Sequence, residues 1–462
     1  MIRFKGSAYI GDNNQTQSMA LKVLPLLSLL LLTTPISANQ ISNQATNPIH
    51  EQNQAKPAIV NLPNPLSLSF LLNDFSLSSP HIALQQSQLD SAKSEQLQAG
   101  VNKAWKAGIE GRLGWREFAN ENQDNHALSL HVSKLLYDAG RSEGLSNAAQ
   151  QSIAAEQLKL VDVQNQQRLE VVQAFLNVLL ADFQYRIDNE AMAVAYVGQD
   201  KLREQHALGR ASDVRLLEVE SQYEKAAVKR KRSEYQQLQR RIQLANRLGY
   251  PQLRPDELKF PSLKKIPATD IKALNLEALQ AEVLNSNPSL QVLRQQLKSQ
   301  EARLASSRAL DSPTLKADAW AGKLSSQPTT REGAWRTELS INIPFVDGGL
   351  QKASTASAMA RLKQVEAQSA LIALQLRDQV AELYFQLQML EAEKKQHQAF
   401  GDYADLYLDY SRALYEHESA TDLGDAMVRL SQANYNMVAW QFKKALLWAQ
   451  LDLLKGQTIQ LN

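Results

Sequence analysis

The chain has 462 residues, of which 44% are hydrophobic and 21% charged, and its formal net charge is +2. This balance gives no indication of a nucleic-acid partner or of an acidic substrate. The chain contains no cysteine, which excludes disulfides, thiolate metal sites, thiol nucleophiles and the acceptor residue of a bacterial lipoprotein. Only 18 glycines and 15 prolines interrupt it, so we expect long elements.

Residues 1–38 have the pattern of a signal peptide. Met19 is a possible true start, because Lys22 gives a short basic region, Val23–Leu32 is an apolar run, and small residues ending at Ala38 are typical of a cleavage site. The apolar run is too short to cross a bilayer as a helix, so we predict export. Residues 39–63 are rich in Asn and Gln and are predicted to form a flexible leader.

The rest of the chain is predicted to consist of two similar halves, residues 64–249 and 274–456. Corresponding residues recur at a constant offset of about 209, so that Asp138 and Gly140 match Asp347 and Gly349. Each half is expected to contain a helix, two strands, a turn with Asp and Gly, a very long helix, a tight turn and a second long helix. Residues 250–273 form a proline-rich linker between the halves, and residues 457–462 form a tail.

Alternation of apolar and polar residues predicts two strands in each half. These strands cover residues 106–118, 127–135, 314–324 and 335–345, and Pro344 is expected to end the last ladder. A sheet in lipid must close on itself, and four strands are too few to do so. We therefore expect several chains to share one barrel. Packing of the strand tryptophans in a small soluble sheet is the alternative.

Two stretches without glycine or proline predict long helices. Leu145–Val197 carries apolar residues at three- and four-residue steps, and Leu350–Phe400 follows the turn formed by Asp347, Gly348 and Gly349. The second stretch allows a helix of about 75 Å, longer than a globular domain needs. One apolar stripe on so long a helix is typical of a coiled-coil seam.

Together these features resemble the TolC family of outer-membrane exit ducts over about residues 64–456. The resemblance rests on SINIPFVDGG from Ser340, its fainter partner LLYDAG from Leu135, and the hairpin tips HALGRASDV and YEHESATDL. It implies an α+β membrane protein in which a long α-helical coiled-coil barrel continues into a trimeric twelve-stranded β-barrel, with four strands per chain and an internal structural duplication. The homotrimer would lie in outer-membrane lipid, with its helical tunnel in the periplasm of a Gram-negative bacterium. The missing cysteine corresponds to a non-acylated member.

The resemblance further implies a passive exit duct and no enzyme activity or cofactor. A periplasmic adaptor (a membrane fusion protein) and an inner-membrane ABC or RND-type pump would open the duct at its periplasmic tip. Type I protein secretion and efflux of drugs or other small molecules both remain open. A periplasmic coiled-coil adaptor or scaffold protein is the alternative from another functional class.

In the TolC family the hairpin tips form the gate. The matching positions in this chain are Gly209, Arg210, Asp213, Arg215, Tyr415, Glu418, Asp422 and Asp425. The chain departs from the family pattern, because Glu418 replaces the second tip glycine, and Arg215 and Gly424 replace the usual acidic residues. Our hypothesis is that Arg210 or Arg215 bonds to Asp422 or Asp425, near Tyr415. Alternatively, Asp213 and Asp422 belong to first turns of helices capped by Ser212 and Thr421.

Other patterns indicate no further site. His126 and His131 are the only close histidine pair, and a five-residue step along a strand places them on opposite faces, so no metal site is expected. The basic run Lys229–Arg232 is interpreted as the solvated face of an exported helix and not as a nucleic-acid site. The sequence contains no phosphate-binding glycine loop and no nucleophile elbow.

Overall fold

The computed structural model describes residues 62–73, 79–118, 121–124, 126–253, 255–263, 271–323, 334–416 and 423–459. The chain divides into two units, Met1–Leu62 and Pro63–Asn462, and the described elements all belong to the second. The predicted signal peptide and nearly all of the predicted leader lie outside the described residues. So do residues 264–270 of the linker, most of the loop between the last two strands, and residues 417–422 of the second tip.

Each half of the described chain runs from a capped helix into strands. In the first half, α2 (Leu68–Asn73) precedes α3 (Pro80–Val101), β1 (Lys106–Arg112), β2 (Trp115–Phe118), β3 (Glu121–Asp124) and β4 (Ala127–Tyr137). The second half contains η2 (Ile271–Ala273), α6 (Leu276–Ser286), α7 (Pro288–Arg308), β5 (Thr314–Lys323) and β6 (Trp335–Asn342). Both α3 and α7 begin with proline at the first helical position, after the caps Ser79 and Asn287.

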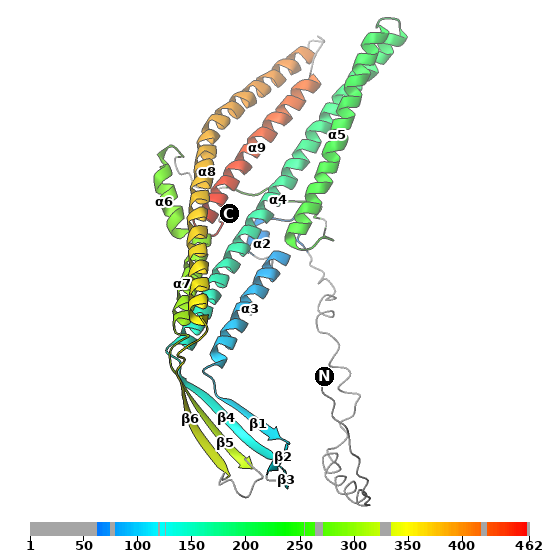
Figure 1. The fold of residues 1–462 in the computed structure, drawn as a ribbon. Coiled ribbons are helices and arrows are strands. Elements are labelled where there is room, and N and C mark those ends of the chain that lie inside the picture. The colour runs from blue at the N-terminus through cyan, green and yellow to red at the C-terminus, as the bar shows by residue number, and fades with distance from the viewer. Residues whose placement is uncertain are drawn as a thin grey trace, which may run out of the picture. The chain divides into compact units, whose positions relative to one another are not determined.

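Two helical hairpins follow the strands. The first consists of α4 (Arg141–Ala207) and α5 (Asp213–Leu248), and the second of α8 (Leu350–Glu416) and α9 (Leu423–Leu454). The helices α4 and α8 each have 67 residues, which gives a length of roughly 100 Å. The strands lie together at one end of these helices, and the hairpin tips lie at the other (Figure 1).

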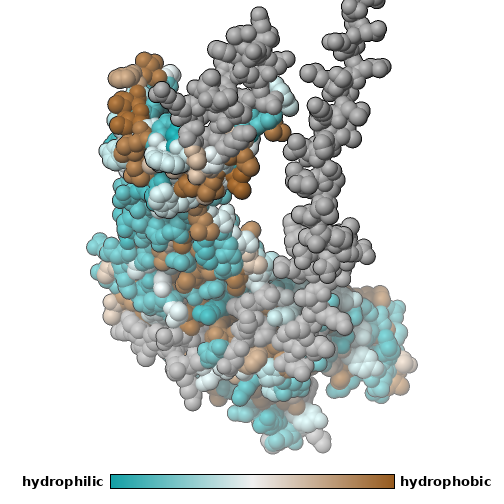
Figure 2. Space-filling view, turned by 90° about the horizontal axis from the view of Figure 1, so that it is seen from below, coloured by the Kyte–Doolittle hydropathy of each residue, from teal (hydrophilic) through white to brown (hydrophobic). Residues whose placement is uncertain are grey.

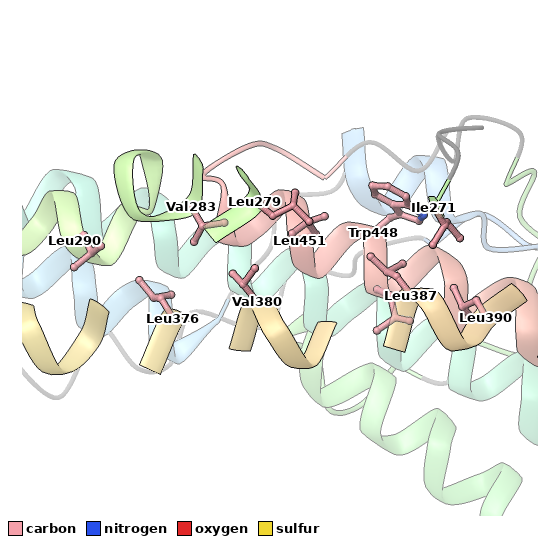
Figure 3. Close-up of a cluster of buried hydrophobic side chains, with 11 residues drawn as sticks. Ile271, Leu279, Val283, Leu290, Leu376, Val380, Leu387, Leu390, Trp448 and Leu451 are labelled. Atoms are coloured by element: carbon pink, nitrogen blue, oxygen red, sulfur yellow. The ribbon is translucent and has the colours of Figure 1, made fainter. Parts of the chain in front are cut away.

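The long helices pass through glycines that we expected to limit them. Gly198 lies inside α4 and Gly401 inside α8, so both helices exceed the predicted stretches. A single glycine costs a helix only about 1 kcal/mol relative to alanine, which the packing of such a helix offsets. Within the second half, eleven buried side chains from η2, α6, α7, α8 and α9 form one apolar cluster that includes Val380, Leu387 and Leu451 (Figure 3).

Four antiparallel strands form one sheet in the order β1-β4-β5-β6. The strand predicted over residues 106–118 is interrupted, because β1 ends at Arg112 and β2 pairs with β3 in a separate two-stranded sheet. The hairpin nevertheless keeps one register across the break, since Arg112 faces Ala127 and Trp115 faces Asp124. The last predicted strand ends at Asn342, two residues before Pro344, which has no N–H for the ladder.

The sheet has an exposed apolar face and a more buried polar face. On the apolar face, Ile109 pairs with Leu130, Leu130 with Ala321, and Ala321 with Trp335. Ile109 is 77% exposed and Trp335 is 70% exposed, whereas Ser133 and Asp318 on the polar face are only 7% and 8% exposed. Apolar side chains are also visible at the surface when the molecule is viewed from the strand end (Figure 2). Burial on this sheet is therefore the reverse of that in a water-soluble domain.

Candidate functional site

The first hairpin tip is closed by a left-handed glycine. Gly209 has a φ of 72°, its N–H donates to the His206 carbonyl over 2.8 Å, and the Arg210 N–H donates to the Gln205 carbonyl over 2.8 Å. This pair of bonds is the Schellman ending of a helix, which favours glycine at that position. The predicted tip residues Gly209 and Arg210 therefore make the turn between α4 and α5.

The charged side chains of this tip are paired within their own hairpin. Asp213 is the first residue of α5, and Ser212 caps that helix by accepting a hydrogen bond from the Arg215 N–H over 3.3 Å. The Asp213 carboxylate lies 2.6 Å from His206 Nε2, and Arg215 Nη1 lies 2.9 Å from Glu218 Oε2. Asp213 therefore lies in the first turn of a helix capped by Ser212, as the alternative prediction stated.

At the second tip the structure describes the two flanking helix ends. Tyr415 is 63% exposed near the end of α8, while Glu418, Thr421 and Asp422 lie outside the described residues. Asp425 accepts a hydrogen bond from Arg429 Nε over 2.6 Å, and this bond and the carboxylate charge raise the pKa of Arg429 above its ordinary value. The hypothesised bond between the two tips stays a prediction.

Gly424, which departs from the family pattern, is explained by helix packing. A Cβ atom at this position would lie 2.7 Å from Val194 Cγ2 on α4, closer than carbon atoms approach without a shift. The start of α9 therefore packs on α4, and glycine permits the close approach. The sequence alone gave no signal for this contact, because Val194 lies far from Gly424 along the chain.

Both predicted strand-to-helix turns are capped by an aspartate. Asp138 Oδ2 accepts a hydrogen bond from the Ser142 N–H over 2.7 Å, and Asp347 Oδ2 accepts one from the Gln351 N–H over 2.6 Å. Gly140, Gly348 and Gly349 take left-handed backbone conformations, with φ of 84°, 65° and 85°. The bonds donated by the Gln351 and Gly349 N–H groups lower the pKa of Asp347. These turns set the direction in which each long helix leaves its strand.

A polar cluster that sequence reasoning missed lies on the polar face of the sheet. We define it as Glu110, His131, Asp318, Trp320 and Arg336. His131 Nδ1 lies 2.6 Å from Glu110 Oε1, and His131 Nε2 lies 2.9 Å from Asp318 Oδ1. The His131 ring stacks on Trp320 with centroids 4.6 Å apart, and the Arg336 guanidinium lies 4.1 Å from the Trp320 ring centroid. No pattern along β4 indicates this cluster, because the side chains that contact His131 come from β1 and β5.

The histidine and acidic side chains of the described residues form no group of three that could hold a metal ion. Among the same residues, no helix is both long and apolar enough to cross a membrane. What the geometry supplies is a sheet with an apolar outer face, two long hairpins, and rigid turns between them.

Residues 279–457 match the family model described as outer membrane efflux protein. This part of the chain is an outer membrane efflux protein domain. The match confirms the predicted family, the outer-membrane location and a role in transport and not in catalysis. The comparison with curated protein sequences gives no significant match.

Solved outer-membrane channels share the fold of the efflux protein at low sequence identity. CmeC of Campylobacter jejuni is 12% identical, with a TM-score of 0.68 over 84% of both chains. VceC of Vibrio cholerae is 15% identical, with a TM-score of 0.67 over 85% of this chain and 97% of its own. MtrE of Neisseria gonorrhoeae, solved in its open state, is 19% identical, with a TM-score of 0.59 over 86% and 89%. At these identities the likeness shows the fold.

Proposed function

We propose that this chain is the passive exit duct of a tripartite export system, and that three copies form one channel. The observation that carries this proposal is the inverted sheet, on which Ile109, Leu339 and Trp335 are 77%, 62% and 70% exposed while Ser129 and Asp318 are buried. Apolar side chains outside and polar side chains inside are what a barrel in lipid requires.

The sheet edges support the trimer. Within the sheet as described, β1 pairs with β4 and β6 pairs with β5, so each has one neighbour. An open edge in lipid would leave backbone N–H and C=O groups without partners. Pairing of β6 with β1 of the next copy would satisfy these groups, and three sheets of four strands would close a twelve-stranded barrel.

An internal duplication is part of the same proposal. The helices α4 and α8 have 67 residues each, and both follow an aspartate-capped turn with left-handed residues. Equal lengths would let the two hairpins reach the same depth below the membrane. Six such hairpins in a trimer would then end together in one ring of tips, as a gate requires.

The proposed gate combines the two tips of neighbouring hairpins. In a single chain Arg215 bonds Glu218 and Asp425 bonds Arg429. Both ion pairs lie at the surface, where such pairs contribute about 1 kcal/mol or less, so an exchange of partners between hairpins would cost little. We expect Arg210 or Arg215 to bond Asp422 or Asp425 in the closed trimer, and an adaptor and inner-membrane pump to break these bonds.

The trimer is tested by isolation from outer membranes. We expect a species that requires detergent, migrates as a trimer unheated and becomes a monomer on heating. A monomer that stays dissolved without detergent would contradict the duct and would favour the periplasmic scaffold alternative.

The gate is tested by single-channel conductance in planar bilayers. Arg215→Ala and Asp425→Ala should each raise the conductance of the closed channel, whereas Arg240→Ala should not, because Arg240 lies in α5 far along the sequence from the tip. Unchanged conductance in both tip variants would overturn the gate pairing. Crosslinking through a cysteine placed at Gly209, followed by identification of the captured pump, would distinguish protein secretion from small-molecule efflux.

A further inference from the structure

The polar cluster on the sheet joins all four strands. Glu110 comes from β1, His131 from β4, Asp318 and Trp320 from β5, and Arg336 from β6. Besides its contacts with His131, the cluster includes an ion pair of 2.8 Å between Lys316 Nζ and Asp318 Oδ1 and a hydrogen bond of 3.4 Å from Trp320 Nε1 to Glu110 Oε2. The first of these contacts lies within β5, and the second reaches from β5 across β4 to β1.

The Trp320 indole is held on both faces. The His131 ring lies parallel to it at an interplanar angle of 3°, and the Arg336 guanidinium lies beside the same indole. Stacking and cation–π contacts each favour this arrangement. The His131 ring is in turn held at both nitrogens, by Glu110 and Asp318. These contacts therefore hold the Trp320 indole in one conformation.

The stack lies on the face that turns away from the exposed apolar side chains. Pairing places His131, Trp320 and Arg336 side by side on β4, β5 and β6. The neighbouring row, on the opposite face, consists of Leu130, Ala321 and Trp335. Trp320 and Trp335 therefore lie on adjacent strands but on opposite faces of one sheet.

We propose that Trp320, clamped between His131 and Arg336, forms a constriction ring inside the barrel, through which cargo leaves the channel. This inference rests on the proposed trimeric barrel, in which three copies of the stack lie at one height. Glu110 and Asp318 position this constriction, because they hold the His131 imidazole that stacks on Trp320. The three indoles narrow the bore to solutes of limited cross-section, and the guanidinium groups beside them add positive charge to the lining.

The absence of cysteine from the chain permits a direct test by thiol labelling. Ser340 lies on the polar face of β6, closer to the helices than Trp320, where it pairs with Lys316. A single Ser340→Cys variant therefore carries a thiol that a reagent added outside the cell reaches only after it passes the ring. The measurement is the ratio of labelling rates for a bulky and a small maleimide on intact cells, so the periplasmic gate has no influence on it.

We expect the bulky reagent to label Ser340→Cys much more slowly than the small one. Adding Trp320→Ala should raise the ratio of rates several-fold, and Trp320→Phe should give an intermediate ratio. Trp335→Ala is the matched control, because it removes the same side chain from the other face of the sheet and should leave the ratio unchanged. Each variant is first shown to form heat-modifiable trimers. Should Trp320→Ala not assemble, Trp320→Phe and Arg336→Ala provide the same comparison.

The outcomes separate this inference from the proposed function. An unchanged ratio in assembled Trp320 or Arg336 variants would overturn the constriction while leaving the duct intact. A larger effect of Trp335→Ala than of Trp320→Ala would overturn it as well, because the wall would then lie on the other face. Failure of even the small reagent to label Ser340→Cys in every background would instead contradict the open barrel itself.

Discussion

The two strand-to-helix turns have the same design but different surroundings. In both, an aspartate accepts a hydrogen bond from the backbone N–H four residues later, and the last two residues before the helix have positive φ. The first turn follows β4, which has neighbours on both sides, and the second follows the edge strand β6. Asp138 is only 5% exposed, whereas Phe345 and Val346 beside the second turn are each 91% exposed.

Contacts from α7 account for the burial of the first turn. Ser306 Oγ donates to the Arg141 carbonyl over 2.9 Å, and a Cβ atom on Gly144 would lie 3.0 Å from the Ala302 carbonyl oxygen. At Gly140, Gly348 and Gly349 alike a Cβ atom would meet nothing within 4 Å, so the close contact lies at the start of α4 and not in the turn itself. The first turn is thus complete in one chain, whereas the second presents its apolar flank to a neighbouring copy in the proposed trimer.

Removal of the buried cap should have the largest effect. Asp138→Ala leaves the Ser142 N–H without its acceptor in a site where Ser142 is 3% exposed, and we expect the free energy of opening the first turn of α4 to fall by about 2 kcal/mol. Hydrogen exchange of that turn should accelerate about 30-fold. Asp138→Asn, which keeps an acceptor oxygen, serves as the control and should retain most of the protection. Equal loss in both variants would contradict a capping role.

Gly348→Ala should have the next largest effect. Gly348 has a φ of 65°, and an L-residue in this conformation costs about 1 kcal/mol even where space is open. We expect faster hydrogen exchange at the start of α8. Gly401→Ala is the matched control, because Gly401 lies inside α8 without positive φ and should slow exchange there. The same sign for both substitutions would exclude backbone strain as the cause.

Ala139→Gly should make the first turn more like the second. Ala139 has a φ of 53° and corresponds to Gly348, so glycine relieves strain but adds freedom to the unfolded chain. We expect a net gain of about 0.5 kcal/mol in local stability, measured by slower exchange of the first turn of α4. A loss of stability would mean that a contact of the Ala139 methyl group stabilises the turn by more than the backbone strain destabilises it.

Acid should destabilise the second turn by protonating the Asp347 carboxylate. Hydrogen bonds from the Gln351 and Gly349 N–H groups lower the pKa of Asp347, so its contribution to stability is complete above the ordinary aspartate value of about 4 and is lost as the pH falls through the lowered value. The thermal midpoint of the proposed trimer should therefore be higher for the wild type than for Asp347→Asn at pH 6. The difference should shrink below about pH 4, and a difference independent of pH would exclude the carboxylate charge as its origin.

Local rules predicted much of the fold. The alternation around Trp335 and the turns at Asp138 and Asp347 depend on neighbours within a few residues, and the structure has each of them where the pattern indicates. The last strand ends at Asn342, two residues before the expected stop at Pro344. The helix ends were less predictable, because Gly198 and Gly401 carry only a small local penalty that packing outweighs. The break in the first predicted strand also escaped local reasoning.

The candidate site likewise contains some features that local patterns predicted and others that they did not. Gly209 and Ser212 were identified at the first tip because turns and caps have local signatures. The contact of Gly424 with Val194 and the stack on Trp320 were not found, because their partners lie far away in sequence. A histidine next to serine on a strand gives no signal of the carboxylates that two other strands bring to it.

By itself, the sequence determined the long helices, the strand pairs with one apolar face, the aspartate-capped turns and the family resemblance, because each depends on residue order over short distances. Only the tertiary structure decided that Ser133 and Asp318 on the polar face of the sheet are buried, and that Glu110, His131, Asp318, Trp320 and Arg336 meet on that face. The physical reason is register: the pairing of four strands sets which side chains share a row, and no single strand contains that information.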